Sequence, residues 1–161
     1  MSKAPIIRTY AWRSALPQLV LLGLIMALVY LLTDLSIDAT IGIGALIYLA
    51  YSLSIRALVA KAHKAGIRRV KAGDFAEAIP HFQESYTFFS QHAWLDRFRY
   101  LLLGSSSKAS YKEMALLNIA FCYSQLGKGE QCRAYYEQAV TEFPDSVVAK
   151  AALNMARSFD A

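Results

Sequence analysis

The sequence predicts an all-α protein in which a two-span transmembrane helical hairpin precedes a short α-helical repeat unit. Two long apolar runs, a polybasic stretch directly after them and two similar helix–turn–helix segments support this prediction. The 161 residues are 56% hydrophobic, with a mean hydropathy of +0.30, which is too apolar for an ordinary soluble domain. At 18% charged residues the chain is also too polar to lie wholly in lipid. Two parts of different composition are therefore expected.

The apolar part follows an N-terminal flank at residues 1–14 and forms a hairpin at 15–58, with spans at about 15–32 and 39–57. Each span is near the lower length limit for a bilayer core of about 30 Å. A soluble helix is rarely apolar on all sides at this length. A cleaved signal peptide is the competing interpretation of the first run. However, no small-residue cleavage motif follows the first run, and a second apolar run comes at once.

Charge flanking the two runs predicts the orientation of the hairpin. The short connector between the spans carries Asp34 and Asp38 and no basic residue, whereas both outer flanks are basic. Positive charge marks the cytoplasmic side. We therefore expect an integral protein, of bacterial inner-membrane type, with both termini cytoplasmic. The cations expected at the membrane surface are Arg56, Lys61, Lys64, Arg68, Arg69 and Lys71.

The basic stretch contains no proline, so we expect the second span to continue as one helix from residue 39 to about 71. Such a helix would hold the cytoplasmic part rigidly on the membrane. Its basic residues contribute much of the formal net charge of +5. Because this excess lies beside apolar spans, it favours membrane lipid over nucleic acid as the partner.

Small residues occur in both spans and allow two interpretations. Gly23 and Ala27 form a small-xxx-small pair, and Gly42, Gly44 and Ala45 lie in the second span. Such residues let helices approach closely. They therefore pack the two spans against each other, or they admit helices of a partner subunit.

The part after the hairpin contains one pattern twice: a helix, a glycine turn, and a helix in which an aromatic residue follows a small residue by four positions. The first copy carries this pattern on Gly66, Ala78 and Phe82. The second copy carries it on Leu116, Ile119, Ala120, Tyr123, Cys132, Tyr136 and Pro144. This pattern resembles the tetratricopeptide repeat family, with Leu116 and Ala120 in place of the family's Trp and Gly.

The resemblance divides the cytoplasmic domain, residues 59–161, into repeats at about 59–92 and 113–146. An insert at 93–112 makes their spacing wider than the about 34 residues of a regular array. A final helix at 147–159 is expected to cap the second repeat. The expected packing face of this final helix is Val148, Ala152, Met155 and Phe159.

Capping signals support the same helix starts. Asp74 and Ser110 are each followed three residues later by a glutamate, which is the pattern of a capping box. Asp145 or Ser146 is expected to cap the final helix.

The resemblance implies that protein segments bind in a groove lined by the first helix of each repeat. In the second copy this face would contain Asn118, Phe121 and Gln125. The insert adds Trp94 and Phe98 on one helical face, which either fill the core of a small unit or form a docking face for a partner.

No catalytic constellation is found in the sequence. His63, His81 and His92 lack ligands at metal-binding spacing. His63 is expected at a front position of the first repeat. The two cysteines, Cys122 and Cys132, fall at tightly packed repeat positions, which favours core thiols over reactive ones. We expect no cofactor, no metal and no enzymatic activity.

The function predicted from these features is that of a membrane-anchored adaptor or scaffold that presents the repeat domain at the cytoplasmic face. Its expected partners are other, membrane-associated proteins and membrane lipid. The alternative is an accessory subunit or assembly factor of a multi-subunit membrane enzyme or transport complex, in which the hairpin makes the main contacts. A third interpretation is a lipid-surface sensor that uses the basic stretch.

Overall fold

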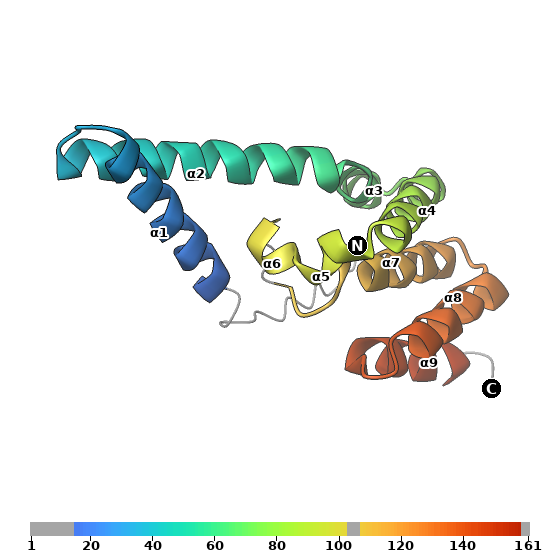
Figure 1. The fold of residues 1–161 in the computed structure, drawn as a ribbon. Coiled ribbons are helices and arrows are strands. Elements are labelled where there is room, and N and C mark those ends of the chain that lie inside the picture. Colours follow the sequence, from blue (N-terminus) through green and yellow to red (C-terminus); the bar gives the residue numbers. More distant parts are fainter. Residues whose placement is uncertain (1–14, 103–106, 159–161) are drawn as a thin grey trace. The chain divides into compact units, whose positions relative to one another are not determined.

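A computed structural model describes residues 15–102 and 107–158, which are predominantly helical (Figure 1). The all-α prediction is confirmed for these residues. The chain divides into two compact units. The hairpin unit is Met1–Val59 with Arg97–Lys108, and the repeat unit is Ala60–Asp96 with Ala109–Ala161.

The hairpin unit is built on α1 (Ala15–Leu32) and α2 (Ile37–Val59), which pack against each other. The two helices approach each other closely at Gly44, since a Cβ atom on Gly44 would lie 2.8 Å from Cγ of Met26. By contrast, a Cβ atom on Gly23 or Gly42 would meet nothing within 4 Å. Gly44 therefore packs the two helices of the hairpin against each other. Gly23 and Gly42 do not have this role, and the space beside them is free of other atoms of the described chain.

Apolar side chains of both helices are largely exposed. In α2 the apolar stretch Ile37–Ile55 has a mean hydropathy of 1.4 and is 11% buried. By length and composition it is the one helix of the described residues that could cross a membrane. The apolar stretch of α1, Leu16–Leu32, is shorter. A pair of spans therefore stays a prediction.

The structure corrects the expectation of one unbroken helix across the basic stretch. Helix α2 ends at Val59, and α3 (Lys61–Ala72) begins after Ala60. Ala60 has φ of −96° and ψ of 20°, which departs from helical geometry. Its side chain is only 1% exposed, so packing of Ala60 accompanies the break although neither proline nor glycine occurs there.

The repeat unit is a succession of helices in which each packs on the next (Figure 1). Buried residues of α4 and α7, with Phe82 and Ile119 among them, form one core cluster. Leu116, Ala139 and Ala149 form a second cluster, which joins α7 to the last two helices. The helices after α3 are α4 (Phe75–Gln91), α7 (Tyr111–Gln125), α8 (Gly129–Glu142) and α9 (Val147–Ser158).

Both helical hairpins of this unit turn at a glycine. Gly73 has φ of 85° and Gly127 has φ of 69°, a region that side chains other than glycine rarely occupy. A third glycine, Gly66, has a packing role. A Cβ atom on Gly66 would lie 2.7 Å from the Phe82 ring, so α3 approaches α4 closely only without a side chain there.

Two of the three predicted caps are present. Ser110 Oγ accepts a hydrogen bond from the amide of Glu113 at 3.0 Å, and Ser146 Oγ accepts one from the amide of Ala149 at 3.0 Å. The cap at Asp74 is wrong, since its side chain accepts no hydrogen bond from the helix. The Asp74 carboxylate instead pairs with the Arg69 guanidinium, with Oδ2 3.3 Å from Nη1.

The final helix packs through a different face from the one expected. Ala149 and Leu153 are buried, whereas Val148 is 37% exposed and Met155 is 63% exposed. The face of α9 that packs against α8 is shifted by one residue from the expected face. It contains alanine, whose small side chain allows close packing. Phe159 lies outside the described residues.

The insert is also interrupted. It forms α5 (Ala93–Arg97) and α6 (Arg99–Leu102), separated at Phe98, so the single helical face that was expected does not exist. Helix α5 falls mainly in the repeat unit and α6 in the hairpin unit.

Candidate protein-binding face

One side of α7 carries the three residues predicted to contact a partner. Asn118, Phe121 and Gln125 are spaced by three and four positions, which places them on one face of the helix. Asn118 and Phe121 are half-buried and Gln125 is exposed. The ring of Phe121 meets that of Phe75 edge-on, with centroids 6.0 Å apart. Because the other side of α7 is buried in the core, this face is held on a rigid support.

The aromatic residues of α4 and of the insert differ in burial. Phe82 and Phe89 are fully buried and fill the core. Trp94 is 57% exposed and Phe98 is 52% exposed. Trp94 belongs to the repeat unit and Phe98 to the hairpin unit.

A residue of the insert that sequence reasoning missed holds the start of α7. Asp96 is 6% exposed, and its carboxylate accepts hydrogen bonds from the amides of Tyr111 at 2.9 Å and Lys112 at 3.0 Å. A negative charge at a helix N-terminus satisfies otherwise unpaired amides and complements the helix dipole. Because Asp96 is far upstream of α7, no local sequence pattern reveals this cap.

A polar cluster joins α4, α7 and α8 near the same helix start. Glu142 contacts Nζ of Lys112 at 2.7 Å and accepts hydrogen bonds from Tyr86 Oη at 2.6 Å and Gln138 Nε2 at 2.8 Å. Burial by itself raises the pKa of Glu142, but the hydrogen bonds from Lys112, Tyr86 and Gln138 outweigh it and lower that pKa. The hydrogen bond to Glu142 raises the pKa of Lys112. The cluster therefore stays ionised and fixes the three helices to one another.

Residues 114–146, which cover most of α7 and all of α8, match the tetratricopeptide repeat model. This segment is a tetratricopeptide-like repeat. No curated protein and no solved structure shows significant similarity to the chain.

Within this tetratricopeptide-like repeat lie Asn118, Phe121 and Gln125, on its first helix. Repeats of this kind stack into surfaces that bind proteins. The family match does not include the first copy, which shares with the second a structure of two helices joined by a glycine turn.

His63 does not stand at the front of the first copy as expected. It is 6% exposed, its Nδ1 lies 3.3 Å from Ser85 Oγ, and its ring meets those of Phe82 and Tyr111 edge-on. Burial lowers the pKa of His63 to about 4. The imidazole is therefore a neutral core residue and does not face a partner.

The cysteines of the tetratricopeptide-like repeat are core residues, as predicted. Cys122 is fully buried and Cys132 is 4% exposed. Burial raises the pKa of Cys122 to about 11, so its reactive thiolate is scarce at neutral pH. Residues 15–102 and 107–158 contain no cluster of three or more His, Cys, Asp or Glu side chains that could hold a metal ion.

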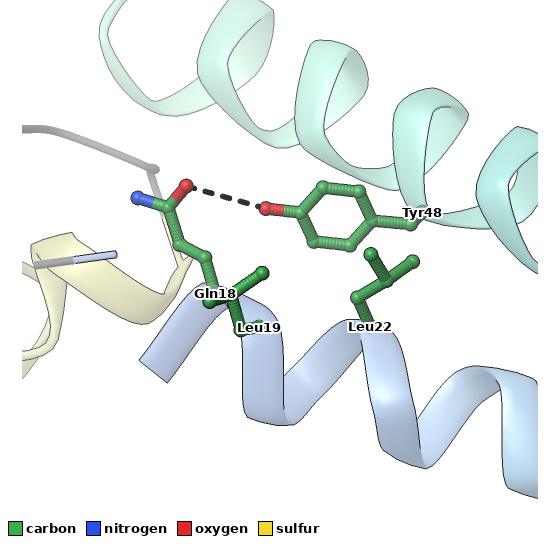
Figure 2. Close-up of a pocket in the computed structure, with 4 residues that line it drawn as sticks. All are labelled: Gln18, Leu19, Leu22 and Tyr48. Carbon is green, nitrogen blue, oxygen red and sulfur yellow. Dashed lines mark hydrogen bonds between the residues drawn. The ribbon is translucent and has the colours of Figure 1, made fainter. Parts of the chain in front are cut away.

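A shallow hollow lies between α1 and α2 of the hairpin unit (Figure 2). Leu19 and Leu22 line it together with Gln18 and Tyr48, and Tyr48 Oη donates to Gln18 Oε1 at 3.4 Å. The Gln18 amide also donates to the carbonyl of Tyr100 at 3.2 Å. Gln18 thus links α1 to both α2 and α6. No local sequence pattern marks Gln18, a polar residue within an apolar run, as a link between helices.

The cations predicted to lie at the membrane surface differ in whether they already have an acidic partner within the chain. Lys61, Lys64, Arg68 and Lys71 are exposed on α3, whereas Arg69 pairs with Asp74. The side chain of Arg56 lies outside the part of the chain that the structure describes.

Proposed function

We propose that this chain is a membrane-anchored adaptor that presents a tetratricopeptide-like repeat unit to partner proteins at the cytoplasmic face of a membrane. The observation that carries the proposal is the repeat match at residues 114–146. Repeats of this family are interaction modules, and their concave surfaces bind proteins. The proposed contacts are Asn118, Phe121 and Gln125, with Trp94 of the same unit as a further exposed aromatic anchor.

The exposed apolar surface of the hairpin unit supports membrane anchoring. Many large apolar side chains of α1 and α2 are more than half exposed, such as those of Leu24 at 63% and Leu46 at 66%. A core helix of a soluble protein would bury such residues, and lipid is the solvent that accommodates them. The described part of α1 contains no ionisable side chain except that of Tyr30. The acids Asp34 and Asp38 at the connector and the cations of α3 favour cytoplasmic placement of the repeat unit.

Variants on the α7 face test the binding proposal. Photo-crosslinking from position 125 in native membranes, followed by mass spectrometry, identifies the partner. Asn118→Ala combined with Gln125→Ala is then expected to reduce capture of that partner by about tenfold, the loss of roughly 1.4 kcal/mol. Gln131→Ala, at an exposed position of α8, is the matched control and should capture the partner normally. Equal capture by both variants would exclude this face.

A second candidate function rests on the open glycines of the hairpin. The space beside Gly23 and Gly42 suits close approach by a helix of another subunit, as in an accessory subunit or assembly factor of a membrane complex. Replacing α1 and α2 with unrelated spans separates the two candidates. An adaptor keeps its partner after the exchange, whereas an integral subunit loses it.

A further inference from the structure

Helix α3 has two chemically different sides. Its buried side includes His63 and Gly66, and Gly66 packs on the Phe82 ring. At about 100° per residue, Lys61, Lys64, Arg68 and Lys71 fall within about 80° of the helix circumference, centred about 150° from that buried side. The sequence of α3, KAHKAGIRRVKA, contains no acidic residue. The helix therefore presents a cationic stripe, defined here as Lys61, Lys64, Arg68 and Lys71.

Three of the four residues of the stripe are available for an anionic ligand. Lys61, Arg68 and Lys71 are exposed and form no ion pair with any residue that the structure describes. Arg69 is different, because it lies off the stripe and already pairs with Asp74. Several like charges side by side repel one another in the absence of counter-charge, so an array of anionic groups stabilises them.

The position of the stripe in the chain favours membrane lipid as the source of the anionic groups. Only Ala60 separates Lys61 from the end of α2. Since consecutive Cα atoms are about 3.8 Å apart, Lys61 lies within about 8 Å of Val59 whatever the direction of α3. If α2 ends at the membrane surface, the first cation of the stripe is at the level of the lipid phosphates. Lysine and arginine also have long stems that let their charged ends reach that level.

We propose that the cationic stripe binds the phosphate head groups of anionic phospholipids. This inference rests on the proposed membrane anchoring and goes beyond orientation of the hairpin, because it makes α3 a lipid-binding helix. The side of α3 opposite the stripe closes the core of the first repeat through Gly66. Lipid binding therefore stabilises α3 and couples membrane composition to the stability of the first repeat.

Lysine acylation in nanodiscs tests the proposal on the full chain. The chain is reconstituted in phosphatidylcholine with or without phosphatidylglycerol, and acylation rates are measured by mass spectrometry. Each cation near an anionic surface raises the binding constant by about fivefold. The acylation rates of Lys61 and Lys71 should therefore be about fivefold lower in anionic discs than in neutral discs. High salt should abolish the difference. Lys128 and Lys150, exposed on other segments, serve as internal controls and should react equally in both discs.

A double variant of the stripe and a double variant of the control lysines distinguish binding by the stripe from attraction of the whole chain. Lys61→Gln combined with Arg68→Gln should weaken the protection of Lys71 several-fold, whereas Lys128→Gln combined with Lys150→Gln should leave it intact. A chain that fails to co-elute with nanodiscs would refute the membrane anchor itself. A chain that inserts but shows equal rates in both lipids would refute the lipid assignment alone. Protection by added polyglutamate, without protection in anionic discs, would replace lipid by an acidic peptide.

Discussion

Replacing Gly66 with alanine should destabilise the repeat unit, although alanine is the better helix former. The added Cβ atom would lie 2.7, 2.8 and 2.9 Å from the Cε1, Cζ and Cδ1 atoms of Phe82. Phe82 is fully buried, so its ring has little room to move. Overpacking of this kind costs about 1–3 kcal/mol, whereas the gain in helix propensity is about 0.5–1 kcal/mol. We expect a net loss of about 1–2 kcal/mol.

Hydrogen exchange of the full chain in mild detergent measures this loss at the amides of α3 and α4. A loss of about 1.4 kcal/mol corresponds to tenfold faster exchange where local opening limits protection. Gly42→Ala is the matched control, because its Cβ atom would meet nothing within 4 Å and should leave protection unchanged or increased. Phe82→Leu should restore part of the stability lost in Gly66→Ala, since it makes room for the methyl group. Unchanged or slower exchange in Gly66→Ala would refute the close-packing explanation.

Three further predictions concern buried polar groups of the repeat unit. Because burial lowers the pKa of His63 to about 4, the unfolded chain binds more protons between about pH 6.5 and 4. The contribution of His63 to the free energy of unfolding is therefore fully present above pH 6.5, and about 3 kcal/mol is lost as the pH approaches 4. Urea midpoints measured across this pH range should show the loss. An equal dependence of the midpoint on pH in His63→Gln would contradict it. Asp96→Asn should cost about 1 kcal/mol and speed exchange at the amides of Tyr111 and Lys112, and unaltered exchange would exclude the cap. Cys122 should resist maleimide in the native chain and react in urea; rapid native labelling would contradict its burial.

Features set by neighbouring residues were predictable from the sequence. The helix start at Ser110 depends on a hydroxyl and an amide three positions apart, and the turn at Gly73 needs a positive φ that glycine allows. The small residues Ala78 and Cys132 are buried where the repeat pattern expects them. Local chemistry and the spacing of small and aromatic residues therefore predict the helices of the repeat unit and the first helix of the candidate face.

Features set by distant contacts were not predictable. Nothing near Ala60 in the sequence signals a break in the helix, because the break accompanies burial of a small side chain. Asp96 caps a helix that begins many residues later, and His63 is buried by rings from α4 and α7. The packed face of α9 likewise depends on how it meets α8. For the candidate face, the spacing of its residues was predictable from the sequence, whereas their exposure depends on the fold.

Accessibility of single introduced cysteines tests the central claim, a hairpin that crosses the membrane twice and leaves the repeat unit on the cytoplasmic side. The native thiols at Cys122 and Cys132 are buried and provide a low background. An impermeant maleimide is applied to intact cells and, separately, to permeabilised cells that express Asp34→Cys or Lys128→Cys. We predict that position 34 is labelled in intact cells, whereas position 128 is labelled only after permeabilisation. Labelling of both positions only after permeabilisation, or of both in intact cells, would contradict the account.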